Sequence, residues 1–131
     1  MTVSVLLMTH ENIGEVILQT VRRVLEVCPL QTQVLHVPFD SDPDQLQIDA
    51  QRMIDSMDSG DGVLVLTDMF GATPSNIAHR LAAAEKVMVV TGLNLPMMIR
   101  VMNYPNLNLA ELVEIAVSGG RDGVIFNRRA L

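Results

Sequence analysis

The fold of this chain is decided by its first apolar run, Val3-Ser4-Val5-Leu6-Leu7-Met8-Thr9-His10. Consecutive apolar positions are typical of a strand that is buried on both faces of a parallel sheet. A helical pattern begins directly after the run, at residues 11–15. His10 therefore lies at the carboxyl end of a buried strand, where open α/β sheets bind their ligands. A histidine there can supply a neutral, nucleophilic imidazole at physiological pH.

Strand and helix patterns alternate along the rest of the chain. The sequence predicts further strands at residues 33–37, 63–66, 87–90 and 123–126. Helices are expected after His10, from Asp42-Pro43, over 74–84, over 95–102, and from Asn108 to a stop at Gly119-Gly120. This order predicts an α/β three-layer sandwich, with a mostly parallel sheet and helices on both faces. Residues 1–131 are expected to form a single domain around one core.

Polar residues that cap helices mark the predicted helix starts. Capping boxes are expected at Asn12 with Glu15 and at Asn108 with Glu111. The other three expected caps are Asp42, Thr73 and Asn94. The apolar face of the first helix is expected at Ile17, Val21, Val24, Leu25 and Cys28. That of the second is expected at Leu46, Ala50, Met53, Ile54 and Met57.

Composition and charge argue against several classes of function. The formal net charge is −6, so nucleic-acid binding, which needs a basic face, is not expected. Cys28 is the only cysteine, and no His, Cys or carboxylate ligands cluster, so we expect neither a metal site nor a cofactor. We see no secretory leader and no apolar stretch of the roughly 20 residues that a membrane span needs. The sequence therefore predicts a cytoplasmic protein.

A carboxylate is expected beside His10. The strand predicted at residues 63–66 is followed by Thr67 and Asp68. If that strand neighbours the first one, His10 and Asp68 meet at the same edge of the sheet. A carboxylate that accepts a hydrogen bond from one ring nitrogen leaves the other nitrogen as a lone-pair nucleophile. The same carboxylate stabilises the cation that forms once the ring is modified. His10 and Asp68 are therefore the candidate catalytic pair.

The loop after Asp68 predicts an anion-binding site. A helix is expected to begin at Thr73-Pro74, and the amino end of a helix attracts anions. Backbone N–H groups of Gly71, Ala72 and Thr73, with the Thr73 hydroxyl, would then form a phosphate cradle. A nucleophilic histidine, an orienting carboxylate and such a cradle together indicate phosphoryl transfer through a phosphohistidine, because this transfer depends on positioning and charge stabilisation.

Each of these signals has an ordinary structural interpretation when it is taken alone. A single histidine after a strand is usually structural or exposed, and Thr73-Pro74 is a common helix start. Their joint placement at one edge of the sheet favours the functional interpretation. For His36, inside a predicted strand, and His79, on a predicted helix, we favour structural or surface roles.

At these residues the chain resembles the enzyme IIA domains of the mannose family of the bacterial phosphoenolpyruvate-dependent sugar phosphotransferase system. Four stretches carry the resemblance: Thr9-His10, and residues 68–76, 91–97 and 119–124. It implies that His10 accepts a phosphoryl group from the phosphocarrier HPr and passes it to an enzyme IIB protein of the mannose, fructose or sorbose class. It also implies that Asp68 hydrogen-bonds the His10 ring and that Thr73 with its neighbouring backbone binds the phosphoryl group.

The resemblance further implies how the chain assembles. The family forms homodimers in which the last strand is exchanged between subunits, and residues 124–126 would be that strand here. The resemblance is also compatible with association of the chain with a membrane IIC/IID complex. No insertion of this chain into the membrane is expected.

Three other functions remain open at this point. One is a stand-alone regulatory module, in which the phosphorylation state of His10 controls a protein partner rather than sugar uptake. A second is a nucleotide- or flavin-binding domain, which is disfavoured because the sequence has neither a GxGxxG motif after its first strand nor a GxxxxGK[ST] loop. A third is a phospho-aspartate receiver that uses Asp68. Glu11 alone is a poor substitute for the acidic cluster that such a receiver needs to hold magnesium.

Overall fold

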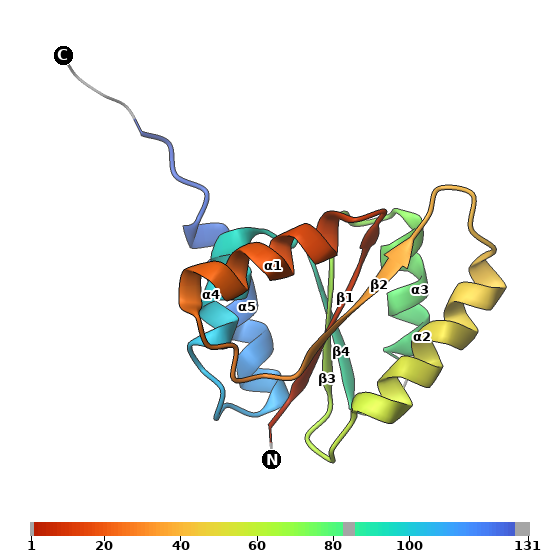
Figure 1. Ribbon diagram of the computed structural model, residues 1–131, viewed down its shortest axis with the longest axis horizontal. Helices are drawn as coiled ribbons and strands as arrows, with labels where there is room; N and C mark the ends of the chain where they lie inside the picture. Colours follow the sequence, from red (N-terminus) through yellow and green to blue (C-terminus); the bar gives the residue numbers. More distant parts are fainter. Residues whose placement is uncertain (1, 83–85, 128–131) are drawn as a thin grey trace.

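Four strands form one parallel sheet in the order β2-β1-β3-β4 (Figure 1). The computed structural model describes residues 2–82 and 86–127. The strands in this part of the chain are β1 (Ser4–His10), β2 (Thr32–Val37), β3 (Val63–Thr67) and β4 (Val87–Thr91). All three pairings are parallel. The condition under which His10 and Asp68 would meet, that the first strand neighbours the one at residues 63–66, is therefore fulfilled, and these two strands occupy the centre of the sheet.

Helices cover both faces of the sheet. One face carries α1 (Ile13–Leu25), α4 (Leu95–Met102) and α5 (Leu109–Asp122), and the other carries α2 (Pro43–Met57) and α3 (Thr73–Leu81) (Figure 1). Helices α4 and α5 pack on each other, and α2 packs on α3. The predicted three-layer α/β sandwich is confirmed.

Strand β1 supplies side chains to the cores on both faces. Val5 and Leu7 belong to the cluster that includes residues of α1, α4 and α5. Leu6 and Met8 belong to the cluster that includes residues of α2 and α3. All four side chains are fully buried, as expected for a central parallel strand. This double anchorage fixes the carboxyl end of β1, and with it His10.

Several predicted helix starts are confirmed. The side chains of Asp42, Asn94 and Asn108 each accept a hydrogen bond from a backbone N–H in the first turn of their helices. Asn108 and Glu111 form both halves of a capping box. The apolar face of α2 is also as predicted, with Met53 only partly buried.

The start and the end of α1 differ from the prediction, and its buried face differs at one position. Asn12 makes no capping bond with its side chain, so the capping box with Glu15 is wrong. The helix ends at Leu25, so Cys28 lies beyond it, and Val24 is mostly exposed. The buried residues of α1 are Gly14, Leu18 and Val21. Ile17, Leu25 and Cys28 are partly buried against the core that includes Val21, so the predicted apolar face is wrong only at Val24.

The C-terminal region also differs from the prediction. Helix α5 passes through Gly119 and Gly120, because both glycines lie against α4 rather than in a turn. A Cβ at Gly119 would come within 2.9 Å of the Arg100 side chain, and one at Gly120 within 2.8 Å of Met97. Residues 123–126 form no strand in this chain. The side chains of residues 124–126 are exposed, and they pair with no strand within residues 2–82 and 86–127.

Candidate functional site

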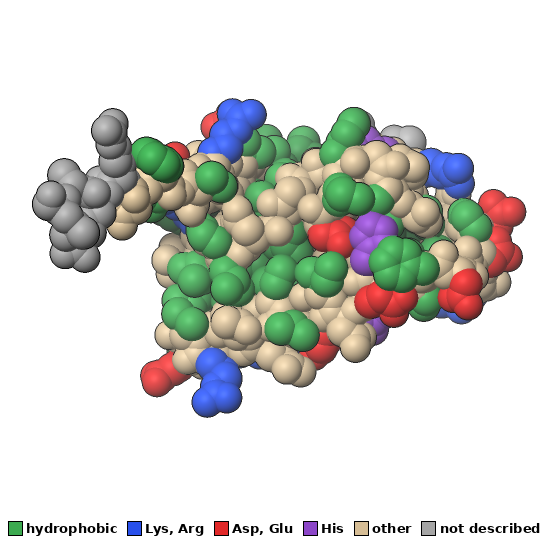
Figure 2. Space-filling view, turned by 90° about the horizontal axis from the view of Figure 1, so that it is seen from above, with side chains coloured by type: hydrophobic (Ala, Val, Ile, Leu, Met, Phe, Trp, Pro, Cys, Tyr) green, Lys and Arg blue, Asp and Glu red, His purple; other side chains and the backbone are tan. Residues whose placement is uncertain are grey.

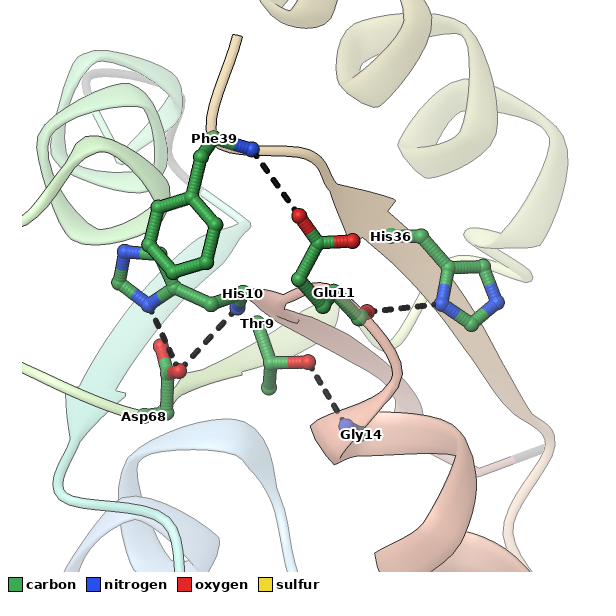
Figure 3. Close-up of polar contacts among 7 residues, drawn as sticks. All are labelled: Thr9, His10, Glu11, Gly14, His36, Phe39 and Asp68. Atoms are coloured by element: carbon green, nitrogen blue, oxygen red, sulfur yellow. Dashed lines mark hydrogen bonds and ion pairs between the residues drawn. The ribbon is translucent and has the colours of Figure 1, made fainter. Parts of the chain in front are cut away.

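His10 and Asp68 meet at the carboxyl edge of the sheet. Met8 of β1 is in register with Thr67 of β3, so the residues that follow the two strands emerge side by side. The Asp68 carboxylate oxygen Oδ2 lies 2.8 Å from His10 Nδ1 and 3.1 Å from the His10 backbone nitrogen (Figure 3). Parallel pairing thus joins two residues that are 58 positions apart.

The pair leaves one ring nitrogen available for chemistry. A carboxylate can only accept a hydrogen bond, so Nδ1 carries the proton and Nε2 carries the lone pair. The side chains of His10 and Asp68 are 16% and 12% exposed, which shields their interaction from solvent. Among the described residues, Asp68 Oδ1 is buried without a hydrogen-bond partner. Buried polar atoms are rarely left unpaired, so this oxygen keeps the capacity to accept a further hydrogen bond.

Thr9 fastens helix α1 to the strand that carries His10. Its side chain is fully buried, and its hydroxyl oxygen accepts a hydrogen bond of 2.7 Å from the backbone N–H of Gly14 (Figure 3). This bond takes over the role that the sequence assigned to Asn12. It satisfies one of the unpaired N–H groups in the first turn of α1.

The predicted phosphate-binding residues lie at the amino end of α3. Gly71 has a φ of 84°, a left-handed conformation that glycine adopts without a Cβ penalty. Ala72, and not Thr73, is the N-cap of α3, and no side chain caps it; the prediction that Thr73 caps the helix is wrong. Thr73 is the first helical residue, and its hydroxyl is not used as a cap. The Ala72 N–H donates to the Met69 carbonyl over 3.4 Å.

Three residues that sequence reasoning did not single out for this site surround the turn at His10 and Glu11. The Phe39 ring is stacked on the His10 ring, with centroids 5.2 Å apart and planes 26° apart. Glu11 accepts a hydrogen bond from the Phe39 backbone N–H over 3.2 Å, and the Glu11 carbonyl lies 2.9 Å from His36 Nδ1 (Figure 3). The sequence held one signal for these three residues, which is that Glu11 directly follows His10.

His79 lies away from this arrangement. Its Nδ1 lies 2.7 Å from the carbonyl of Ser75, one helical turn earlier in α3. The ring of Phe70 approaches it edge-on at 5.7 Å. His79 is therefore held by its own helix.

Large apolar side chains are exposed around the carboxyl ends of the strands. Each follows a strand in the sequence; they are Ile13, Phe39, Met69, Phe70 and Leu95. Figure 2 shows hydrophobic side chains beside a histidine on the face seen from above, with lysine and arginine only towards its periphery. Exposed apolar groups gathered in this way mark a surface for binding another molecule.

A groove lies between β4 and α5. It has a volume of about 470 Å³, and the residues that line it include Val89, Val113, Val117 and Val124. Strand β4 pairs only with β3 among the described strands, so its other edge is open. This groove does not include His10 or Asp68.

Two further findings concern metals and membranes. No group of three or more His, Cys, Asp or Glu side chains in residues 2–82 and 86–127 is arranged to hold a metal ion. In the same residues, the helices are too short or too polar to cross a membrane.

Comparison with known proteins defines the class to which this fold and site belong. Residues 4–117 match the model of the family described as "PTS system fructose IIA component", EIIA-man. The chain therefore belongs to the mannose-class EIIA family of the sugar phosphotransferase system, as its sequence motifs predict.

Individual relatives agree with this assignment. The chain is 30% identical over 127 residues to the PTS system mannose-specific EIIAB component of Escherichia coli K12. The match covers 95% of this chain but spans only 39% of that relative. The mannose/sorbose-specific IIA subunit of Enterococcus faecalis shares the fold over 100% of this chain and 98% of its own, with a TM-score of 0.87 and 23% identity. The PTS IIA protein associated with the fucose utilization operon of Streptococcus pneumoniae has a TM-score of 0.75 and 26% identity, over 96% of this chain and 93% of its own.

Proposed function

We propose that the chain is a phosphoryl carrier in which His10 Nε2 accepts a phosphoryl group from phospho-HPr and passes it to an enzyme IIB protein. The observation that carries this proposal is the 2.8 Å contact between His10 Nδ1 and Asp68 Oδ2. Because that contact occupies Nδ1, the nucleophilic lone pair is on Nε2.

In each transfer one bond to phosphorus forms as another breaks, and the total charge does not change. The Nε2 lone pair attacks phosphorus, the bond between phosphorus and the donor atom breaks, and its electron pair stays with the donor. The phosphorylated ring keeps its proton on Nδ1 and becomes cationic. The Asp68 carboxylate stabilises that cation by a charge-assisted hydrogen bond. In the second transfer, the phosphorus–Nε2 bond breaks and its electron pair returns to the ring.

The amino end of α3 is the proposed cradle for the phosphoryl oxygens. The N–H groups and the positive end of the helix dipole favour an anion there. The Thr73 hydroxyl is not engaged in capping, so it is free to donate to a phosphoryl oxygen. Gly71 gives the loop a conformation that most side chains would strain.

The phosphoryl donor and acceptor are proposed to be proteins. The exposed apolar side chains that follow the strands surround the His10 edge, and a protein surface can cover them. We propose that HPr and an enzyme IIB protein bind this surface in turn, in keeping with the family. By the same family argument the protein acts in the cytoplasm, alongside a membrane IIC/IID complex.

The test is phosphorylation in a mixture of radiolabelled phosphoenolpyruvate, enzyme I, HPr and the purified protein. We expect label that is stable to base and labile to acid on the wild type, and none on His10→Ala. Label that persists on His10→Ala would overturn the proposal. Addition of an enzyme IIB protein should then remove the label. Retention of the label would instead indicate a regulatory module.

We also propose that two copies associate by exchange of residues 124–126. Val124, Ile125 and Phe126 are 78%, 76% and 87% exposed, and the open edge of β4 lies beside an apolar groove. An exposed apolar segment and an unpaired edge strand are mutually complementary. We expect a dimeric mass by analytical ultracentrifugation, and a monomeric mass for a chain that ends at Gly123. A wild-type monomer would refute the exchange.

A further inference from the structure

We propose that Phe39 is a positioning residue for the reaction at His10 and that Glu11 holds Phe39 in place. This inference rests on the proposed phosphorylation of His10 and goes beyond it. Neither residue belongs to the His10–Asp68 pair or to the loop at residues 71–73.

Phe39 is placed on His10 by something other than burial. Its ring lies 5.2 Å from the His10 ring at 26°, within the range of favourable aromatic pairs. The Phe39 side chain is nevertheless 81% exposed, so it lies outside both core clusters. A side chain with so little buried area needs a fixed backbone to keep it over one neighbour.

Glu11 supplies that fixation. Its carboxylate accepts from the Phe39 backbone N–H, and its own backbone is tied to β2: the Glu11 N–H donates to the Val37 carbonyl over 3.1 Å, and His36 Nδ1 donates to the Glu11 carbonyl. Glu11 has a φ of 46°, an uncommon conformation for a residue other than glycine. Such conformations persist where the surrounding structure determines them. We call the arrangement of Glu11, His36 and Phe39 the clamp.

The clamp supplies a constraint that Asp68 cannot. A single hydrogen bond at Nδ1 fixes one point of the imidazole but lets the ring tilt about that point. Phe39 covers one face of the ring and opposes this tilt. The direction of the Nε2 lone pair is thereby held, and phosphoryl transfer is sensitive to the alignment of the attacking atom. Glu11 therefore acts on the reaction only through Phe39.

The rate of single-turnover transfer from saturating phospho-HPr tests the clamp. We expect Phe39→Ala to slow transfer about tenfold, whereas Phe39→Tyr keeps the stacked ring and the rate. Glu11→Ala should also slow transfer. Glu11→Gln keeps an acceptor oxygen for the Phe39 N–H, so it should transfer at the wild-type rate. Because Glu11 acts through Phe39, the double variant Glu11→Ala/Phe39→Ala should be no slower than Phe39→Ala alone.

Tyr104→Ala is the matched control, because Tyr104 is an exposed aromatic that follows α4 and lies outside the group of apolar side chains around the His10 edge. It should leave the single-turnover rate unchanged. Equal losses in Phe39→Ala and Tyr104→Ala, additive losses in the double variant, or an unchanged rate in Phe39→Ala would each overturn the inference. A Phe39→Ala effect that disappears at saturating phospho-HPr would also overturn it, since Phe39 would then be a docking contact.

A second measurement separates this inference from the proposed function. Carbon-13 relaxation of the His10 ring in the unphosphorylated protein reports ring motion without any transfer. We expect greater ring motion in Phe39→Ala and Glu11→Ala than in the wild type, and no increase in Tyr104→Ala. Unchanged relaxation refutes the clamp, whereas absence of label on wild-type His10 refutes the proposed function.

Discussion

The Asp68 carboxylate holds His10 at two points, the ring Nδ1 at 2.8 Å and the backbone N–H at 3.1 Å. Both bonds are made by the same oxygen, Oδ2. One bond fixes the strand end relative to β3, and the other fixes the tautomer of the ring. Asp68 thus joins a structural role to the role proposed for it in phosphoryl transfer.

Replacement of Asp68 by Asn should slow transfer without unfolding the protein. The amide oxygen can still accept both hydrogen bonds, but it carries no charge to stabilise the phosphorylated, cationic ring. We expect a loss of at least about tenfold in the transfer rate from phospho-HPr, or about 1.4 kcal/mol. Asp61→Asn, an exposed carboxylate before β3, is the control and should transfer normally. An unchanged rate in Asp68→Asn would remove Asp68 from the mechanism.

Replacement of Thr73 by Val should weaken the proposed phosphate cradle. Thr73 does not cap α3 with its side chain, so loss of its hydroxyl should leave the helix intact by circular dichroism. We expect transfer to slow about tenfold, because one hydrogen bond to a charged group is lost. Thr20→Val removes a hydroxyl that bonds the Val16 carbonyl on α1 and should leave transfer unchanged. Equal rates in the wild type and Thr73→Val would exclude this hydroxyl from the cradle.

Replacement of Gly14 by Ala should destabilise the protein. A Cβ at Gly14 would lie 2.9 Å from Thr9 Oγ1 and 3.3 Å from Leu7 Cβ, and both neighbours belong to the buried strand β1. Overpacking of this kind costs about 1–3 kcal/mol, which chemical denaturation can measure. Gly120→Ala is the matched helical control, because the atom nearest its Cβ is the terminal methyl carbon of Met97, the far end of a flexible side chain. Similar losses in both variants would show that the packing at Gly14 is not special.

The ionised carboxylate of Asp58 should make the free energy of unfolding depend on pH in the acidic range. Hydrogen bonds from the backbone N–H of Gly60 and, more weakly, Gly62, together with the charge of Lys86, hold the pKa of Asp58 below its ordinary value against a partial desolvation penalty. A lowered pKa in the folded state favours folding above the unfolded-state pKa of about 3.9. That contribution is lost as pH falls through the folded-state pKa.

Comparison with Asp58→Asn tests this, because the amide keeps an acceptor oxygen but does not titrate. The wild type should be more stable than the variant at neutral pH, and the gap should narrow below about pH 4. Urea denaturation at several pH values measures the gap. A gap that stays constant down to pH 2 would contradict the role of the charge.

The sequence by itself determined the layers of the fold and the existence of the His10–Asp68 pair. Continuous apolar runs identify buried parallel strands, and the residues that follow neighbouring parallel strands must share one edge. The pairing of His10 with Asp68 needed only the further condition that β1 and β3 are neighbours. Caps such as Asp42 and Asn108 could also be predicted from the sequence, because a capping side chain accepts hydrogen bonds from N–H groups within the next three residues.

Only the tertiary structure decided the features that depend on contacts between distant segments. Thr9 replaced Asn12 at the start of α1, and α5 continued through Gly119 and Gly120 because those glycines face α4. The segment 124–126, predicted as a strand, pairs with no strand among the described residues, because strand pairing depends on which edge the fold brings beside a segment. Phe39 came to lie on His10 because Glu11 and β2 hold its loop. Local patterns specify what neighbours in sequence can do, whereas these outcomes depend on which surfaces the sheet brings together.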